Sequence, residues 1–254
     1  MTQPTISIIT VVYNSASLLE MTMMSVFEQD YPNIEYVIVD GASTDGSLAL
    51  IQKKDEQIDR WISEPDKGLY DAMNKGIDLA TGDFIWFMNA GDTIPTKDTV
   101  RKMVACCEED TDVLYGEVML VNEHREALGT RSECTTQQLP KQLTWKSLRY
   151  GMVVCHQGFL PRRTIVPKYM MNNLSADINW VIECLKKSRR TSQTNIILAH
   201  YLTGGISKNR HQQSLKDRYQ ILQKQYGFFP NLFAHSWIIL RAFWAKYVQR
   251  KEYV

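Results

Sequence analysis

The sequence lacks several patterns that would define other classes of protein. Its five cysteines include no C-x-x-C pair, so neither a disulfide framework nor a zinc site is predicted. No apolar run reaches the roughly 18 residues that a membrane-spanning helix needs. The first residues also lack the basic start of a signal peptide. We therefore expect a reduced, cytoplasmic protein that is either soluble or peripheral on the inner face of the cytoplasmic membrane.

Common nucleotide-binding and hydrolase motifs are missing as well. The chain contains no G-x-G-x-x-G and no Walker A loop, which disfavours a Rossmann dehydrogenase and a P-loop ATPase. It contains no G-x-S-x-G nucleophile motif. Any nucleotide site in this chain must therefore be built in another way.

The charges are nearly balanced in number but not in position. The chain has 29 basic and 28 acidic residues, which is unlike a nucleic-acid-binding protein, and no nucleic-acid partner is expected. Residues 207–254 nevertheless hold nine Lys/Arg and two acidic residues, a net +7 that leaves −6 for the rest of the chain. A basic, aromatic end on an acidic body predicts an anionic surface as a partner.

The first 95 residues alternate short apolar segments with amphipathic ones. The apolar segments 6–13, 36–40, 60–63 and 84–88 are rich in β-branched and aromatic residues, so we expect them to be buried strands. Helical spacing of apolar residues lies between them, for example over 67–80. The alternation predicts an α/β fold, a doubly wound, Rossmann-like and mostly parallel sheet with right-handed crossovers.

Beyond residue 95 the pattern is less regular. We expect helices near 97–108 and 176–187, strands near 113–121, 128–133, 152–161 and 195–202, and two final helices separated by 227–230. The predicted organisation is one domain over 1–206, with a first half at 1–95 and a second half at 96–206. A basic, aromatic, helical extension follows at 207–254.

A polar cluster follows each expected strand of the first half. The clusters are Asn14, Asp40–Gly46, Glu64–Gly68 and Asn89–Asp92. Ligands of doubly wound sheets bind beyond the carboxyl ends of the strands, where the carboxylates of these clusters would converge. Such a group suits a cation, sugar hydroxyls or base nitrogens. Ordinary turn residues would explain any one cluster, but four at equivalent positions favour a binding site.

Four segments carry a resemblance to a known family. They are Ile8–Asn14 (IITVVYN), Val37–Gly46 (VIVDGASTDG), Ser63–Gly76 (SEPDKGLYDAMNKG) and Ala80–Asp92 (ATGDFIWFMNAGD). Together they resemble family 2 glycosyltransferases with the GT-A fold, most closely the bacterial branch that builds extracellular and capsular polysaccharides. The resemblance is strong over about the first hundred residues and looser in the second half.

The resemblance implies an inverting transfer of a sugar from a nucleotide-diphosphate donor. UDP-sugar is the first choice of donor and GDP-sugar the second, and the acceptor is a saccharide or a lipid-linked saccharide. Asp40 matches the carboxylate that hydrogen-bonds the nucleobase, and Asp66 matches the nucleoside edge of the pocket. The expected donor-binding residues are Tyr13, Asn14, Asp40, Asp66, Asn74, Lys75, Asn89, Ala90 and Gly91.

The segment Asn89–Asp92 matches the D-x-D motif that holds a divalent metal on the donor diphosphate. The match is incomplete, because Asn89 and Gly91 stand where acids are usual and only Asp92 keeps a charge. One carboxylate plus donor phosphates can still hold Mg²⁺, which takes few protein ligands. The resemblance therefore implies Mg²⁺ or Mn²⁺ at Asp92, with strict metal dependence in doubt.

The acceptor side has one candidate catalytic residue. Ser175–Trp180 (SADINW) matches the acidic motif that carries the general base of inverting enzymes, which makes Asp177 the candidate base. As an alternative, Asp177 is an N-cap of the following helix; the two roles are compatible.

Two further segments resemble parts of the acceptor or diphosphate site. Cys155–Pro161 resembles a His-Gln segment beside the sugars, which points to His156 and Gln157, although a buried core histidine explains His156 equally well. Tyr201–Lys208 resembles a late loop that closes over the diphosphate, with Lys208 or Arg210 in reach of phosphate. A hinge with solvated charges is the alternative for this loop.

Residues 232–248 predict a helix whose aromatic and aliphatic side chains cover about half of its circumference. Such a helix either packs its apolar face on the body or lies in a membrane interface with Trp and Phe buried among lipids. A homodimer surface is a further alternative.

Two other classes of protein stay open on the sequence alone. A sugar nucleotidyltransferase uses a related sheet, but it normally has a Gly-rich, Arg-containing loop after the first strand, and Tyr13-Asn14 follow that strand here. A non-catalytic, membrane-associated relative that binds nucleotide sugars is supported only by the degenerate metal motif.

Overall fold

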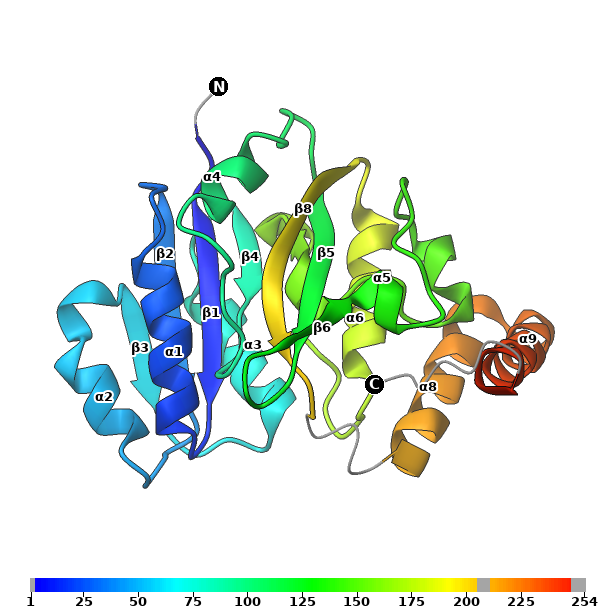
Figure 1. Ribbon diagram of the computed structural model, residues 1–254, viewed down its shortest axis with the longest axis horizontal. Coiled ribbons are helices and arrows are strands. Elements are labelled where there is room, and N and C mark those ends of the chain that lie inside the picture. Colours follow the sequence, from blue (N-terminus) through cyan, green and yellow to red (C-terminus); the bar gives the residue numbers. More distant parts are fainter. Residues whose placement is uncertain (1–2, 205–210, 248–254) are drawn as a thin grey trace.

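The structure is a computed structural model that describes residues 3–204 and 211–247. Four parallel strands form the first sheet, in the order β3-β2-β1-β4. They are β1 (Ile6–Val12), β2 (Ile34–Asp40), β3 (Arg60–Ser63) and β4 (Phe84–Phe87). The helices α1 (Ala16–Phe27), α2 (Ser47–Lys53) and α3 (Leu69–Leu79) connect them (Figure 1).

Hydrophobic layers cover both faces of this sheet. Along β1, Ile6 and Ile8 pack in one cluster with residues of α1 and α4 (Thr99–Val104), whereas Ile9 and Val11 pack in the other cluster with residues of α3. All seven residues of β1 are buried. Parallel sheets have this property because helical crossovers cover both of their faces.

The second sheet is mixed and is built around β5 (Val113–Val121). This strand pairs antiparallel with β6 (Ala127–Thr130) and β7 (Phe159–Pro161) and parallel with β8 (Thr191–Leu202). An isolated bridge between Phe84 and Arg162 joins the two sheets. The helices α5 (Arg131–Cys134) and α6 (Ala176–Lys187) also belong to this half, together with 3-10 turns at 145–150, 156–158 and 163–165.

Two helices close the described chain, α8 (His211–Tyr226) and α9 (Phe228–Tyr247). Gly227 separates them with a φ of 89°, in the left-handed region that favours glycine. Helix α8 packs into the body, because Ile221 and Leu222 belong to the same buried cluster as residues of α6. Helix α9 lies on the outer side of α8, at the right of Figure 1.

The predicted fold class is confirmed: the protein is α/β, with a parallel central sheet and a helical C-terminal part. Two predicted strands are shorter than expected. Thr130 and Glu133 form a reciprocal capping box that begins α5, so β6 ends at Thr130. Only 159–161 of the segment 152–161 is strand, since a 3-10 turn occupies 156–158. The division of the chain at residue 206 stays a prediction.

No helix in the described ranges, 3–204 and 211–247, is long and apolar enough to cross a membrane.

Candidate active site

The loops that follow β1 and β2 are tied together at the lower edge of the sheet in Figure 1. The Asn14 backbone N–H donates to Ser43 Oγ at 2.8 Å, and the Thr44 N–H donates to Asn14 Oδ1 at 2.8 Å. Asn14 adopts a positive φ of 47°, which Asn tolerates better than most residues. Asn14 therefore fixes the shape of the Asp40–Gly46 loop.

Asp40, the last residue of β2, is completely buried. Its Oδ2 accepts hydrogen bonds from the Ser43 N–H at 3.0 Å and from Ser63 Oγ at 2.6 Å. Its Oδ1 is buried and has no hydrogen-bond partner among the described residues. Buried acceptors are nearly always paired, so this oxygen is suited to an N–H that a ligand supplies.

Two further residues that were predicted to bind the sugar donor lie beside Asp40, over Gly41. A Cβ at Gly41 would lie 2.4 Å from Asp66 Oδ2 and 3.2 Å from Tyr13 Cδ2. The Tyr13 ring is 64% exposed, whereas Asp66 is half-buried with its Oδ1 accepting the Gly68 N–H at 2.7 Å. Because residue 41 has no side chain, an exposed aromatic ring and a carboxylate can lie directly over the backbone next to Asp40.

Asn74 and Lys75, on α3, support loops of the site. Lys75 Nζ donates to Pro65 O at 2.8 Å and pairs with Glu64 Oε1 at 2.8 Å, which fixes the loop that carries Asp66. The Asn74 amide bonds both the N–H and the C=O of Tyr169. In this structure both side chains form hydrogen bonds or ion pairs with other residues of the chain. Their contact with the nucleotide-sugar donor stays a prediction.

Asp92 is the last residue of the degenerate motif and is 3% exposed. Its Oδ1 accepts the Leu202 N–H at 3.1 Å, and its Oδ2 accepts Gln157 Nε2 at 2.7 Å. Burial raises the pKa of Asp92 to about 7, against these hydrogen bonds and the nearby Arg125 charge, which lower it. The carboxylate thus joins the loop after β4 to two segments of the second half.

The other residues of this motif differ in their surroundings. Asn89 Oδ1 is buried and has no hydrogen-bond partner in the described part of the chain. Ala90 is half-buried and packs against the cluster of α1. Gly91 has a φ of 105°, and a Cβ there would lie 3.1 Å from Leu202 Cδ2. Its carbonyl oxygen accepts Arg125 Nη1 at 2.5 Å.

The described residues contain no group of three His, Cys, Asp or Glu side chains that could hold a metal ion. Among the side-chain oxygens of this motif, Asn89 Oδ1 has no partner in the described residues, whereas both oxygens of Asp92 accept hydrogen bonds. A carbonyl-type oxygen is an acceptable ligand for Mg²⁺ or Mn²⁺ when phosphates supply the rest of the shell. Asp92 as a metal ligand stays a prediction.

His156 lies in an aromatic cluster next to this motif. Its Nε2 forms a hydrogen bond with the Tyr169 hydroxyl, and its ring stacks on Phe87 with centroids 5.1 Å apart. Burial lowers the pKa of His156 to about 4, so the ring is neutral at pH 7. Gln157, the next residue, holds Asp92 and receives Trp86 Nε1 on its carbonyl oxygen at 2.7 Å. Their predicted contact with substrate stays untested.

Asp177 is half-buried in the first turn of α6. The N-cap position belongs to Ser175, so the alternative of Asp177 as N-cap is wrong. Its Oδ1 accepts the Ile178 N–H at 2.8 Å. Burial raises the pKa of Asp177, while that bond and the Arg218 charge oppose the increase. Asp177 is thus a partly buried carboxylate whose charged form is favoured by the Arg218 cation.

Helix α8 holds the turn that carries Asp177. Asp217 Oδ2 accepts the Leu174 N–H at 2.8 Å, and Ser175 Oγ donates to Ser214 O at 3.0 Å. Arg218, which follows Asp217, is half-buried, and its positive charge acts on Asp177. Helix α8 therefore supplies a cation near the candidate base and the hydrogen bonds that hold the turn before it.

Sequence reasoning did not find Arg125 or Arg218. Arg125 lies in the turn between β5 and β6, and Arg218 lies on a polar helix, and no motif spacing marks either residue. Folding brings the Arg125 charge close enough to lower the pKa of Asp92, and the Arg218 charge close enough to lower the pKa of Asp177. Lys208 and Arg210, the cations that were predicted, lie outside the described residues.

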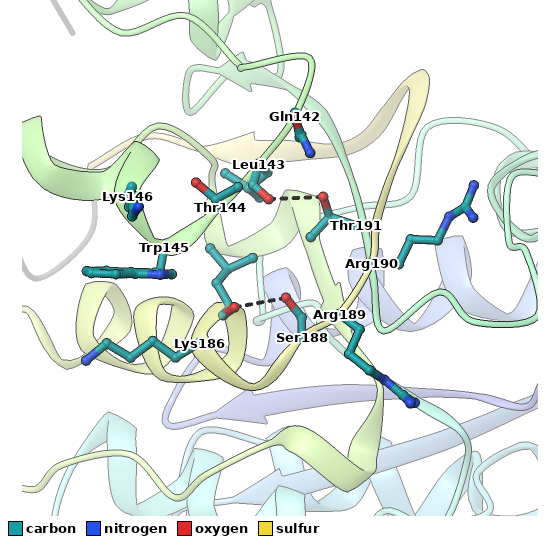
Figure 2. A pocket seen from close by; sticks show the side chains of 11 residues that line it. Gln142, Leu143, Thr144, Trp145, Lys146, Lys186, Ser188, Arg189, Arg190 and Thr191 are labelled. Atoms are coloured by element: carbon teal, nitrogen blue, oxygen red, sulfur yellow. Dashed lines mark hydrogen bonds between the residues drawn. The ribbon is translucent and has the colours of Figure 1, made fainter.

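A surface hollow lies elsewhere. It encloses about 540 Å³ between the segment 142–146 and the C-terminal end of α6, and no predicted site residue lines it (Figure 2). Its cations have acidic neighbours: Lys186 pairs with Glu183 at 3.6 Å, and Arg190 pairs with Asp110 at 3.3 Å. This hollow is therefore not part of the candidate active site.

Comparison with known proteins identifies the class of enzyme. The sequence model of Glycosyl transferase family 2 matches residues 7–169. The chain is also 30% identical over 218 residues to a PGL/p-HBAD biosynthesis glycosyltransferase of Mycobacterium bovis, covering 82% of this chain and 80% of that protein. The chain belongs to glycosyl transferase family 2, and it is a glycosyltransferase.

Solved structures agree on the fold. Residues 1–349 of S. aureus TarS, in complex with UDP-GlcNAc, match with a TM-score of 0.67 at 17% identity, covering 94% of this chain and 72% of that one. The mannosyltransferase PcManGT from Pyrobaculum calidifontis, in complex with GDP-Man and Mn²⁺, matches with a TM-score of 0.66 at 17% identity, covering 98% and 76%. The fold is GT-A, and the family decides against a sugar nucleotidyltransferase.

The buried Asp92 leads to a testable pH dependence of stability. An acid whose pKa is raised on folding from about 4 to about 7 binds more protons folded than unfolded, so folding loses free energy as pH rises through that window. Relative to Asp92→Asn, the wild type should lose about 2–4 kcal/mol of unfolding free energy between pH ~4 and ~8. Urea denaturation at several pH values measures this difference.

A matched control is Glu123→Gln, which changes an exposed acid. Its stability curve should run parallel to that of the wild type. Parallel curves for Asp92→Asn would contradict the raised pKa of Asp92.

Proposed function

We propose that the enzyme transfers a sugar from a UDP-sugar to a saccharide or lipid-linked saccharide, with inversion at the anomeric carbon. The observation that carries the donor proposal is the buried, unpaired Oδ1 of Asp40. Uracil presents a single imide N–H that suits a single acceptor oxygen, whereas guanine presents two adjacent N–H groups. The exposed Tyr13 ring beside Gly41 offers a stacking surface for the base.

The chemistry on the acceptor side is a single displacement. Asp177 takes the proton of the acceptor hydroxyl while that oxygen attacks the anomeric carbon, and the nucleoside diphosphate leaves from the opposite face. Burial favours this role, because it raises the pKa of Asp177 toward the range of a useful base. Arg218 opposes that shift, because its positive charge favours the ionised carboxylate.

The diphosphate also needs compensating charge. A divalent cation, when bound, would neutralise the charge that develops on the leaving group. We propose Asn89 Oδ1 and Asp92 as its protein ligands, with donor phosphates completing the shell. Ala90 and Gly91 offer their backbone beside it, and Lys208 or Arg210 are proposed to reach the phosphates. His156 and Gln157 are proposed to border the sugars.

The location of the enzyme is part of this proposal. A nucleotide-sugar donor is a cytoplasmic metabolite, and a lipid-linked acceptor would be met at the inner face of the cytoplasmic membrane. The net charge of +7 over residues 207–254 supports such a site of action.

Asp40→Asn tests the nucleobase contact. The amide NH₂ of Asn would replace one of the two carboxylate oxygens of Asp40. It would then face another N–H group, either that of Ser43 or the imide of uracil, and one hydrogen bond would be lost. The dissociation constant of UDP should rise by about 10- to 100-fold, measured by calorimetry. The control is Asp59→Asn, because Asp59 accepts the Tyr36 N–H near the start of β2, away from Asp40 at its end. This variant should bind UDP like the wild type. Unchanged UDP binding by Asp40→Asn would remove Asp40 from the base site.

Asp177→Asn tests the base. Hydrolysis of the UDP-sugar, with water in place of the acceptor, should fall by at least about 100-fold, while UDP affinity stays within about threefold of wild type. Arg218→Gln removes a charge that lowers the pKa of Asp177, so the acidic limb of the pH–rate profile should move to higher pH. Turnover at the wild-type rate in Asp177→Asn, or an unmoved acidic limb in Arg218→Gln, would refute these roles.

Asn89→Asp tests the cation. A carboxylate in place of the amide should tighten Mn²⁺ binding in the presence of UDP by about tenfold, as followed by electron paramagnetic resonance of free Mn²⁺. The control is Asn195→Asp, an exposed position on β8. The idea fails if both variants bind Mn²⁺ with the affinity of the wild type.

A further inference from the structure

Helix α9 turns its largest apolar side chains outward. The exposed fractions of these side chains lie between 46% and 71%. Residues 229, 233, 237, 240 and 244 recur every three or four positions and so share one side of the helix. The exposed set includes Phe228, Phe229, Leu232, Phe233, Trp237, Ile239, Leu240 and Trp244.

The opposite side of α9 faces the body. Asn231 and Ala234 are 1% exposed, and Asn231 Nδ2 donates to Tyr219 O at 3.2 Å. The His235 ring contacts the Tyr219 ring with centroids 4.7 Å apart. Arg241 donates to Tyr150 O at 3.3 Å. The helix is therefore held in one orientation by small and polar contacts, and its apolar face is not the face that packs.

This arrangement is the reverse of a normal surface helix, which buries its apolar side. Soluble monomers rarely expose a contiguous apolar patch of this kind, so such a patch marks a partner surface. The explanation in which α9 packs its aromatic residues on the body is wrong for this structure.

Charge decides which partner fits. Helix α9 contains no Asp or Glu, and residues 207–254 carry a net +7. Two copies of this segment placed face to face would bring like charges together, which disfavours self-association. An anionic lipid surface complements both features, because it attracts a segment of net positive charge while Trp and Phe enter the acyl boundary.

We propose that the exposed face of α9 docks on an anionic lipid bilayer, with the helix lying in the plane of the membrane. No helix in the described ranges can span a bilayer, which agrees with an interfacial position. Its 20 residues give a contact about 30 Å long. The docking itself is independent of the reaction proposed above.

The docked helix is connected to the candidate base. Tyr219 contacts α9, and Asp217, two residues earlier on α8, bonds the turn that carries Asp177. If the proposed transfer is correct, and this step rests on it, the membrane-bound enzyme presents its acceptor side to lipid-linked saccharides.

The test is flotation of the full-length protein with vesicles of phosphatidylcholine alone or with about 30% phosphatidylglycerol. Binding should require the anionic lipid and should fall several-fold as NaCl rises from about 0.05 to 0.5 M. The double variant Phe233→Ser/Trp237→Ser should partition at least about tenfold less. Leu128→Ser, an exposed apolar residue of β6, is the control and should bind like the wild type.

Brominated lipids should quench tryptophan fluorescence in the wild type and less in the double variant. Donor hydrolysis should be equal in all variants, so a failure of docking can be told apart from a failure of the proposed reaction. Three results would overturn the proposal: no binding by the wild type, equal binding by the double variant, or a dimer in light scattering that the double variant dissociates while vesicles bind neither protein.

Discussion

The buried carboxylate of Asp92 is the contact on which the candidate site depends. It is the point where the loop after β4 meets Gln157 and the end of β8, each through a hydrogen bond to a different oxygen. Burying a carboxylate is costly, and the pKa of about 7 reflects that cost. The two hydrogen bonds offset part of this desolvation cost. They also fix the loop after β4 of the first sheet against two segments of the second half.

The backbone next to this contact favours glycine over an acid at position 91. Residue 91 has a left-handed φ of 105°, and a Cβ there would meet the Leu202 side chain at 3.1 Å. Glycine suits this position on both counts, because another residue would be strained at this φ and its Cβ would crowd the Leu202 side chain. Arg125 then reaches the Gly91 carbonyl oxygen at 2.5 Å. Residue 91 therefore takes part in this contact region through its backbone and not through a side chain.

The sequence predicted several elements of both halves closely, because there each signal is local. The strands 60–63 and 113–121 and the helix 176–187 were predicted with the ends that the structure shows. The segment 152–161 was not, since its shape depends on Gly158 lying against the carbonyl oxygen of Gly116, a contact with a distant strand. The site shows the same limit. Asp40 and Asp177 lie in recognisable motifs, whereas Arg125 and Arg218 are placed only by the packing of a turn and of α8.

Helix α9 differs from the core elements of the fold in exposing its large apolar side chains. Amphipathic periodicity predicted that a helix would form and which residues would share its apolar side, but periodicity does not say which side meets the body. That choice is made by Asn231, Ala234 and His235, whose small or polar side chains fit against Tyr219. A helix that packs through its polar side keeps its apolar side available. Helix α8 contacts both α9 and the turn of Asp177, so it joins the outward-facing helix to the segment that carries the candidate base.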